Sequence, residues 1–286
     1  MSAENPIRVV ATTSMIADLA RQIGGDLVAI EGLMGPGVDP HLYQASEGDV
    51  SALTEAELVF YNGLHLEGKM VEIFEQMEGR GMRFHAVSAG LSNEQLLHSE
   101  QFSGSHDPHI WFDPALWAHA AGRVGEVLAE LDPDHATVYT ASVEAYRVEL
   151  ESLSSWARMA LDSVPAEYRV LVTSHDAFGY FGRAFDLDVY GLQGLSTVLE
   201  AGTADVRDLA AFVAERQIPS LFLESSISPR GMEAVQAAVS ARGFEVRIGG
   251  TLYGDALGGP GTGADTYVGM LRSNVETIVA GLTPGS

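Results

Sequence analysis

Residues 133–165 read PDHATVYTASVEAYRVELESLSSWARMALDSVP. Within this stretch apolar residues recur in alternating steps of four and three, at Tyr139, Val143, Tyr146, Leu150, Leu153, Ala157, Ala160 and Val164. That spacing predicts one amphipathic helix, which begins with Pro133 after a capping carboxylate and ends before Pro165. The 32 residues of such a helix would extend for about 50 Å. A helix this long predicts a stiff connector between two domains; the alternative is a surface helix of a single domain.

The chain on each side of this helix alternates between strand-like and helix-like segments. Apolar, β-branched runs predict strands at 7–12, 27–33, 58–61 and 83–87, and again at 169–173, 188–192, 220–224 and 245–248. This order predicts an α/β fold of two lobes, each with a mainly parallel four-stranded sheet flanked by helices. The lobes are expected at residues 1–131 and 165–286, joined by one long rigid helix at 132–164.

The composition excludes several classes of function. The chain has 286 residues, 46% of them hydrophobic, and a net charge of −23, so it can bury a large core but would be repelled by nucleic acid and anionic lipid. It has no cysteine, which excludes disulfides, thiolate metal sites and thiol nucleophiles. No run reaches the ~18 apolar residues of a membrane-spanning helix. The N-terminus lacks the features of a signal peptide, so either the protein is cytoplasmic or an export signal has been removed.

Four turn-rich loops place a metal-ligating side chain near a predicted strand or helix end. They contain His41, His109, His175 and Asp255, which are separated by 68, 66 and 80 residues. Three of these loops follow strands, and ligands of parallel α/β sheets bind at the carboxyl ends of strands. Three imidazoles and one carboxylate would suit a divalent transition metal. A single loop histidine is more often a solvated or capping residue, so the spacing leaves open whether the four converge.

The chain resembles, nearly from end to end, the zinc- and manganese-binding solute receptors of ABC importers, the TroA-like family. The resemblance depends on five motifs in this order: GPGVDPHLYQAS at 35–46, YNGLHLEGKM at 61–70, DPHIWFDP at 107–114, VTSHDAFGYFGRAF at 172–185 and LYGDALG at 252–258. It implies two lobes joined by a rigid helix, with one metal ion bound between them by His41, His109, His175 and Asp255. It also implies export, either free in a periplasm or held by a lipid anchor, and delivery of the ion to an ABC permease.

Zinc is favoured as the bound ion and manganese is the alternative, because three nitrogens and one carboxylate form a borderline-soft set. We expect a monomer with no catalytic residue. The alternatives are a zinc-dependent hydrolase and a surface adhesin of the same family. The chain lacks an H-E-x-x-H motif, and a fourth protein ligand would close the site to activated water. Many zinc-specific receptors of the family also carry a long His-rich loop; here the stretch 92–106 is short and contains only His98 and His106.

Roles can also be predicted for two further groups of residues. His65 is expected in a pocket wall, with a purely structural role as the alternative, and His85 is expected in the packed core. A metal-bound imidazole usually donates its other N–H to a carboxylate. Asp113, Glu200 and Glu224 are candidates for that role, although each could equally be a helix cap or a surface charge.

Overall fold

A computed structural model describes residues 5–79, 81–99 and 106–283. The first lobe is built on a sheet in the order β2-β1-β3-β4, and all three of its strand pairs are parallel. This confirms the four-stranded parallel sheet predicted for the first half of the chain. Its strands are β1 (Ile7–Ala11), β2 (Val28–Gly32), β3 (Leu58–Tyr61) and β4 (Phe84–Ala86).

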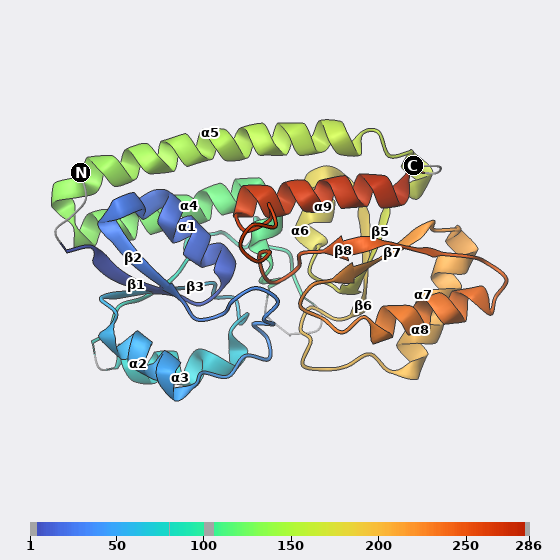
Figure 1. Ribbon diagram of the computed structural model, residues 1–286, viewed down its shortest axis with the longest axis horizontal. Helices are drawn as coiled ribbons and strands as arrows, with labels where there is room; N and C mark the ends of the chain where they lie inside the picture. Colours follow the sequence, from blue (N-terminus) through green and yellow to red (C-terminus); the bar gives the residue numbers. More distant parts are fainter. Residues whose placement is uncertain (1–4, 80, 100–105, 284–286) are drawn as a thin grey trace.

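Helices cover both faces of this first sheet (Figure 1). One face packs on α1 (Ser14–Gly24) and α4 (Pro114–Leu131), and the other on α2 (Glu47–Glu55) and α3 (Val71–Glu78). Local caps fix where these helices begin: Thr13 caps α1, Ser46 forms a capping box with Asp49 at α2, and Asp113 caps α4 just before Pro114.

The second lobe differs in detail from the prediction of one four-stranded sheet. Its strands form two separate parallel pairs, β5 with β6 and β7 with β8, and β5 packs beside β7. The backbone N–H of His175 donates to the Glu224 side chain at 2.8 Å. Where the two strand pairs meet, this backbone donor is therefore bonded to a side chain and not to the backbone of the neighbouring strand. The elements are β5 (Val170–His175), β6 (Asp188–Gln193), β7 (Ser220–Glu224), β8 (Arg247–Leu252), α6 (Gly179–Phe185), α7 (Thr203–Arg216), α8 (Arg230–Ser240) and α9 (Tyr267–Leu282).

Strand β8 starts later and runs further than the predicted 245–248. Gly249 and Gly250, which the sequence suggested were in a loop, lie inside this strand. They are glycines because other elements approach the strand closely at these positions. A Cβ at Gly249 would lie 2.8 Å from the Phe222 ring, and one at Gly250 would lie 2.5 Å from Thr277 on α9. Gly250 also has a φ of +145°, and the register with β7 shifts beside it. The strand therefore needs glycine at a point where propensity argues against a strand.

The long helix α5 (Ala136–Leu161) lies across both lobes and packs on α4 and α1 of the first lobe and on α9 and α6 of the second (Figure 1). It has 26 residues and follows a 3-10 turn at Pro133–His135, so it is shorter than predicted. Gly125 of α4 lets the two helices meet, because a Cβ there would lie 2.5 Å from Val143. The connector predicted between two lobes is therefore present.

One large hydrophobic cluster continues through both lobes. It includes Val9 of β1, Trp117 of α4, Leu150 of α5 and Tyr267 of α9. The lobes therefore share a core, and the predicted division at residues 131 and 165 stays a prediction. None of the helices in the described part of the chain is long and apolar enough to cross a membrane.

Candidate metal centre

The four residues singled out from the sequence lie together between the lobes. His41 is in the loop after β2, His109 precedes the turn that leads into α4, His175 is the last residue of β5, and Asp255 follows β8. One ligand atom from each lies within 4.8 Å of the others, and all four residues are buried. Fold topology therefore brings two donors from each half of the chain to one point, at the carboxyl ends of strands or in a loop beside them.

The spacing of the donor atoms matches a metal coordination shell. The Nε2 atoms of His41 and His109 are 3.3 Å apart. Carboxylate oxygens of Asp255 lie 3.6 Å from Nε2 of His41, 3.6 Å from Nε2 of His109 and 3.3 Å from Nε2 of His175. Four donors placed 2.0–2.2 Å from a central zinc ion form a tetrahedron with edges of about 3.3–3.6 Å. These four distances match such edges, and the donor atoms as a set lie within 4.8 Å of one another.

Two of the imidazoles are oriented by buried carboxylates through their far nitrogens. Nδ1 of His109 lies 2.7 Å from Asp107, whose Oδ1 also accepts the backbone N–H of His109 at 2.9 Å. Nδ1 of His175 lies 2.7 Å from Oε2 of Glu224. Both contacts leave Nε2 directed at the site, which is the arrangement that metal-binding histidines require.

Of the three carboxylates predicted for this role, Glu224 performs it and the other two do not. Asp113 caps α4 and pairs with Arg183, and Glu200 is exposed in the loop before α7. Asp107 was missed. The sequence Asp-Pro-His could have indicated it. In such a turn the Asp side chain can accept a hydrogen bond from the backbone N–H of the histidine two residues later.

The same local pattern occurs at His41, where Asp39 Oδ1 accepts the backbone N–H of His41 at 2.8 Å. On the opposite side of the site, the indole of Trp111 donates to the carbonyl of Gly254 at 3.1 Å and holds the residue next to Asp255. The backbone of each of these two loops is thus anchored immediately beside its ligand.

Burial and charge set the protonation of the ion-free site. Burial lowers the pKa of His41 to about 3, so this imidazole is neutral and ready to donate a lone pair. Burial would also lower the pKa of His175, but the carboxylates of Glu224 and Asp255 raise it above its ordinary value. Burial would raise the pKa of Asp255, yet the imidazoles, with His175 foremost, hold it below its usual range. The arrangement therefore favours the ionised form of Asp255 and the protonated form of His175.

A cation would fit this arrangement better than a proton does. Both oxygens of Asp255 are buried, and imidazole nitrogens of His41, His109 and His175 lie 3.3–3.6 Å from them. A buried ionised carboxylate is costly inside a protein unless positive charge neutralises it. Three imidazole nitrogens and one carboxylate oxygen are a donor set that divalent transition metals favour.

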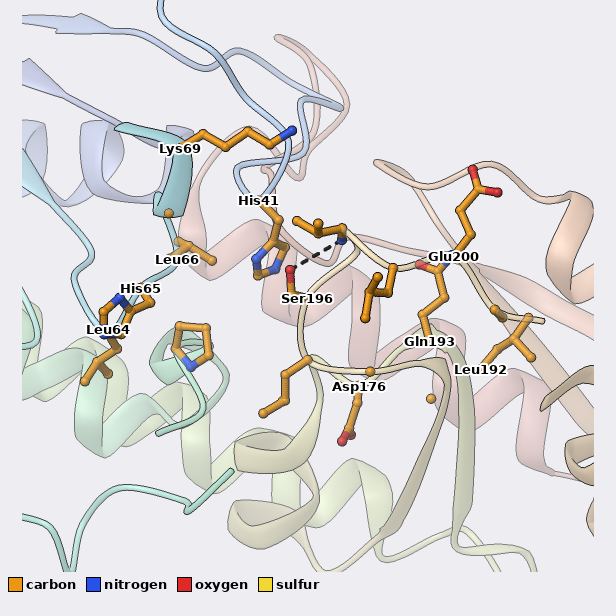
Figure 2. A pocket seen from close by; sticks show the side chains of 18 of the residues that line it. His41, Leu64, His65, Leu66, Lys69, Asp176, Leu192, Gln193, Ser196 and Glu200 are labelled. Carbon is orange, nitrogen blue, oxygen red and sulfur yellow. Dashed lines mark hydrogen bonds between the residues drawn. The ribbon is translucent and has the colours of Figure 1, made fainter. Parts of the chain in front are cut away.

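A pocket of about 1210 Å³ opens directly beside the site (Figure 2). Among the four candidate ligands, His41 alone lines it, while the other three lie deeper. His65 also lines the pocket, as predicted. His85 was wrongly expected in the core: it is only partly buried on β4, within 3.4 Å of the Arg123 side chain. His98 and His106 form an isolated antiparallel bridge, and the rest of their loop, 100–105, lies outside the described residues.

Fold and site together define a class: a two-lobed α/β protein with a buried site of three histidines and one aspartate between its lobes. The chain belongs to the family described as zinc-uptake complex component A, periplasmic, whose profile matches residues 9–281. The resemblance found in the sequence is thus confirmed.

Characterised relatives cover almost the whole chain. The zinc-binding protein TroA of Treponema pallidum is 48% identical over 98% of this chain and 90% of its own length. The manganese-binding lipoprotein MntA of Bacillus subtilis is 42% identical over 98% of this chain and 91% of its own length. The solved structure of the Treponema protein superposes with a TM-score of 0.94 over 98% of this chain and all of that one. The family consists of substrate-binding receptors of ABC transporters and not of enzymes, so it does not support the hydrolase alternative.

Proposed function

We propose that this protein captures one divalent transition-metal ion between its lobes and delivers it to an ABC-type importer. The ion is cargo, and His41, His109, His175 and Asp255 are its ligands. The observation that carries the proposal is the convergence at one point of these four buried side chains, three imidazoles and one carboxylate. A closed set of four protein ligands fits capture and storage, because it leaves no coordination position for a reacting water.

Zinc is the ion we propose, with manganese as the alternative. Three nitrogen donors favour zinc, and intrinsic affinity rises from manganese towards zinc. The relatives support both ions, since one is named for zinc and another for manganese. Each oxygen of Asp255 lies near the Nε2 atom of a candidate ligand histidine. Both oxygens could therefore bind the ion, which would give a fifth bond to an ion that prefers a higher coordination number.

The partner we propose is the permease of the importer, met by a monomeric receptor outside the cytoplasmic membrane. Relatives named as lipoproteins support attachment by lipid, and the family description supports a periplasmic location. The net charge of −23 would favour the approach of cations, an effect that salt weakens.

The test is titration of metal-free protein with Zn²⁺ and, separately, with Mn²⁺, followed by calorimetry and metal analysis. We expect one tight site per chain, lost in His109→Ala, whose imidazole is fully buried. The matched control is His98→Ala, which removes an exposed histidine and must leave the tight site intact. Two comparably tight sites, or none, would contradict the proposal.

A further inference from the structure

A single side chain connects a candidate ligand of the first lobe to a loop of the second. Oδ1 of Asp39 accepts the backbone N–H of His41, and Oδ2 of Asp39 accepts the hydroxyl of Thr197 at 2.5 Å. Thr197 lies 158 residues further along the chain, in the loop 194–202 between β6 and α7. One carboxylate therefore holds the His41 loop and the second-lobe loop together.

The loop 194–202 lines the pocket that opens beside the site. Its residues Leu195, Ser196, Val198 and Leu199 line the same pocket as His41, and Figure 2 labels His41 and Ser196 among the lining residues. Thr197 and Leu195 are buried at 6% and 7% exposure, whereas Leu199 is 80% exposed. The loop is thus held by the hydrogen bond of Thr197 and projects into solvent at Leu199.

His41 is the candidate ligand through which the pocket reaches the site. The other three do not line the pocket, and all are at most 1% exposed. One hydrophobic cluster spans both lobes, so a local movement of two loops opens the site at less cost than separation of the lobes. A contact that joins those two loops controls such a movement.

We propose that the Thr197–Asp39 hydrogen bond is a latch that retains the metal ion by holding the His41 loop against the loop 194–202. The inference rests on the proposed function. Asp39 is a positioning residue: it binds no metal, and it acts through the backbone of His41. Breaking the latch allows the His41 loop and the loop 194–202 to move apart, so the ion leaves faster.

The test measures release of Zn²⁺ from the loaded protein to an excess of chromogenic chelator by stopped flow. Thr197→Val keeps the shape of the side chain and removes the hydroxyl. We expect release to accelerate about tenfold to a hundredfold, the range for loss of a hydrogen bond to a charged group. Asp39→Ala should accelerate release at least as much, and the double variant should be no faster than Asp39→Ala alone, because both changes break one connection.

Two controls separate a latch from general loosening. Thr197→Ser keeps a hydroxyl and should release zinc within about threefold of the wild-type rate. Thr203→Val removes an exposed hydroxyl at the start of α7 and should behave as the wild type. The melting temperature of metal-free Thr197→Val should fall by no more than about 10 °C, because the variant removes one hydrogen bond and leaves the packed core unchanged.

The outcomes are distinguishable. An unchanged release rate in both Thr197→Val and Asp39→Ala, with wild-type protein that binds one ion, would overturn the latch and leave the proposed function standing. Equal acceleration in Thr197→Ser would also overturn it. Wild-type protein that bound no ion would overturn the proposed function and the latch together.

Discussion

Glu224 holds His175 at two atoms: its Oε1 accepts the backbone N–H at 2.8 Å, and its Oε2 lies 2.7 Å from Nδ1 of the same residue. Both side chains are completely buried. Glu224 ends β7 and His175 ends β5, so this pair also joins the two strand pairs of the second lobe. The carboxylate fixes the ring orientation and increases the basicity of Nε2, the atom directed at Asp255.

Glu224→Gln should weaken zinc binding by about 10- to 100-fold, the usual effect of removing a carboxylate behind a ligating histidine. The amide keeps the shape and loses the charge that supports the ring. Competition titration against a chelator of known affinity measures the change. Glu276→Gln, an exposed position on α9, is the matched control. Zinc affinity within about twofold of the wild type would show that Glu224 does not support a ligand.

Metal binding should displace a proton from His175 in the neutral range. The pKa of His41 is already lowered to about 3, so this imidazole has none to lose. The pKa of His175 in the ion-free protein is raised, so below that value a proton competes with the ion. Zinc affinity should therefore rise with pH, by up to about tenfold per unit, and level off once pH exceeds the pKa of His175. Calorimetry in buffers of different ionisation enthalpy counts the protons; release of none between about pH 6 and 7 would contradict this assignment.

Replacing His175 should affect zinc and manganese differently according to the new side chain. His175→Ala leaves a gap that only water can fill, so both affinities should fall. His175→Glu supplies a harder oxygen donor, but it places a carboxylate against Glu224, and like charges in a buried site resist joint ionisation. We therefore expect the shift of the Mn²⁺/Zn²⁺ affinity ratio towards manganese to be clearest in His175→Glu combined with Glu224→Gln. Competition calorimetry measures the ratio. If His175→Ala leaves zinc affinity within about twofold, His175 is not a ligand.

The lobes should move only slightly when the ion binds. Trp117 of the first lobe stacks on Tyr267 of the second at 5.2 Å between ring centroids, and the Tyr267 hydroxyl donates to the carbonyl of Trp111 at 2.8 Å. Asp18 of α1 accepts the backbone N–H of Tyr267 at 2.9 Å. Wide closure would break these buried contacts. Small-angle scattering of ion-free and zinc-loaded protein should give nearly equal radii of gyration, and a large compaction on loading would refute this expectation.

Periodicity was sufficient to predict the α/β class and the long helix. The strand-end loops supplied His41, His109, His175 and Asp255 only as candidates, and the resemblance to the receptor family predicted that they meet at one site. These patterns could not predict the split of the second lobe into two strand pairs, because pairing is decided by contacts between distant segments such as Glu224 and His175. Strand β8 was cut short because Gly249 and Gly250 have low strand propensity, and only the packing against Phe222 and α9 explains them. The contact of Asp39 with Thr197 joins residues 158 positions apart in the sequence, so no local sequence pattern could predict it.

The buried cluster that runs from Val9 to Leu282 continues without interruption past the connecting helix. Parts of a chain with separate cores can unfold in separate steps, whereas parts that share a core lose it together. Helices α5 and α9 pack against each other, so removing either half of this molecule would expose apolar surface of these helices to water. The chain should therefore unfold as one cooperative unit, and an ion held by four residues would raise the midpoint of that single transition. Cargo loading would then protect the whole receptor from thermal unfolding and proteolysis, including helices far from the ion.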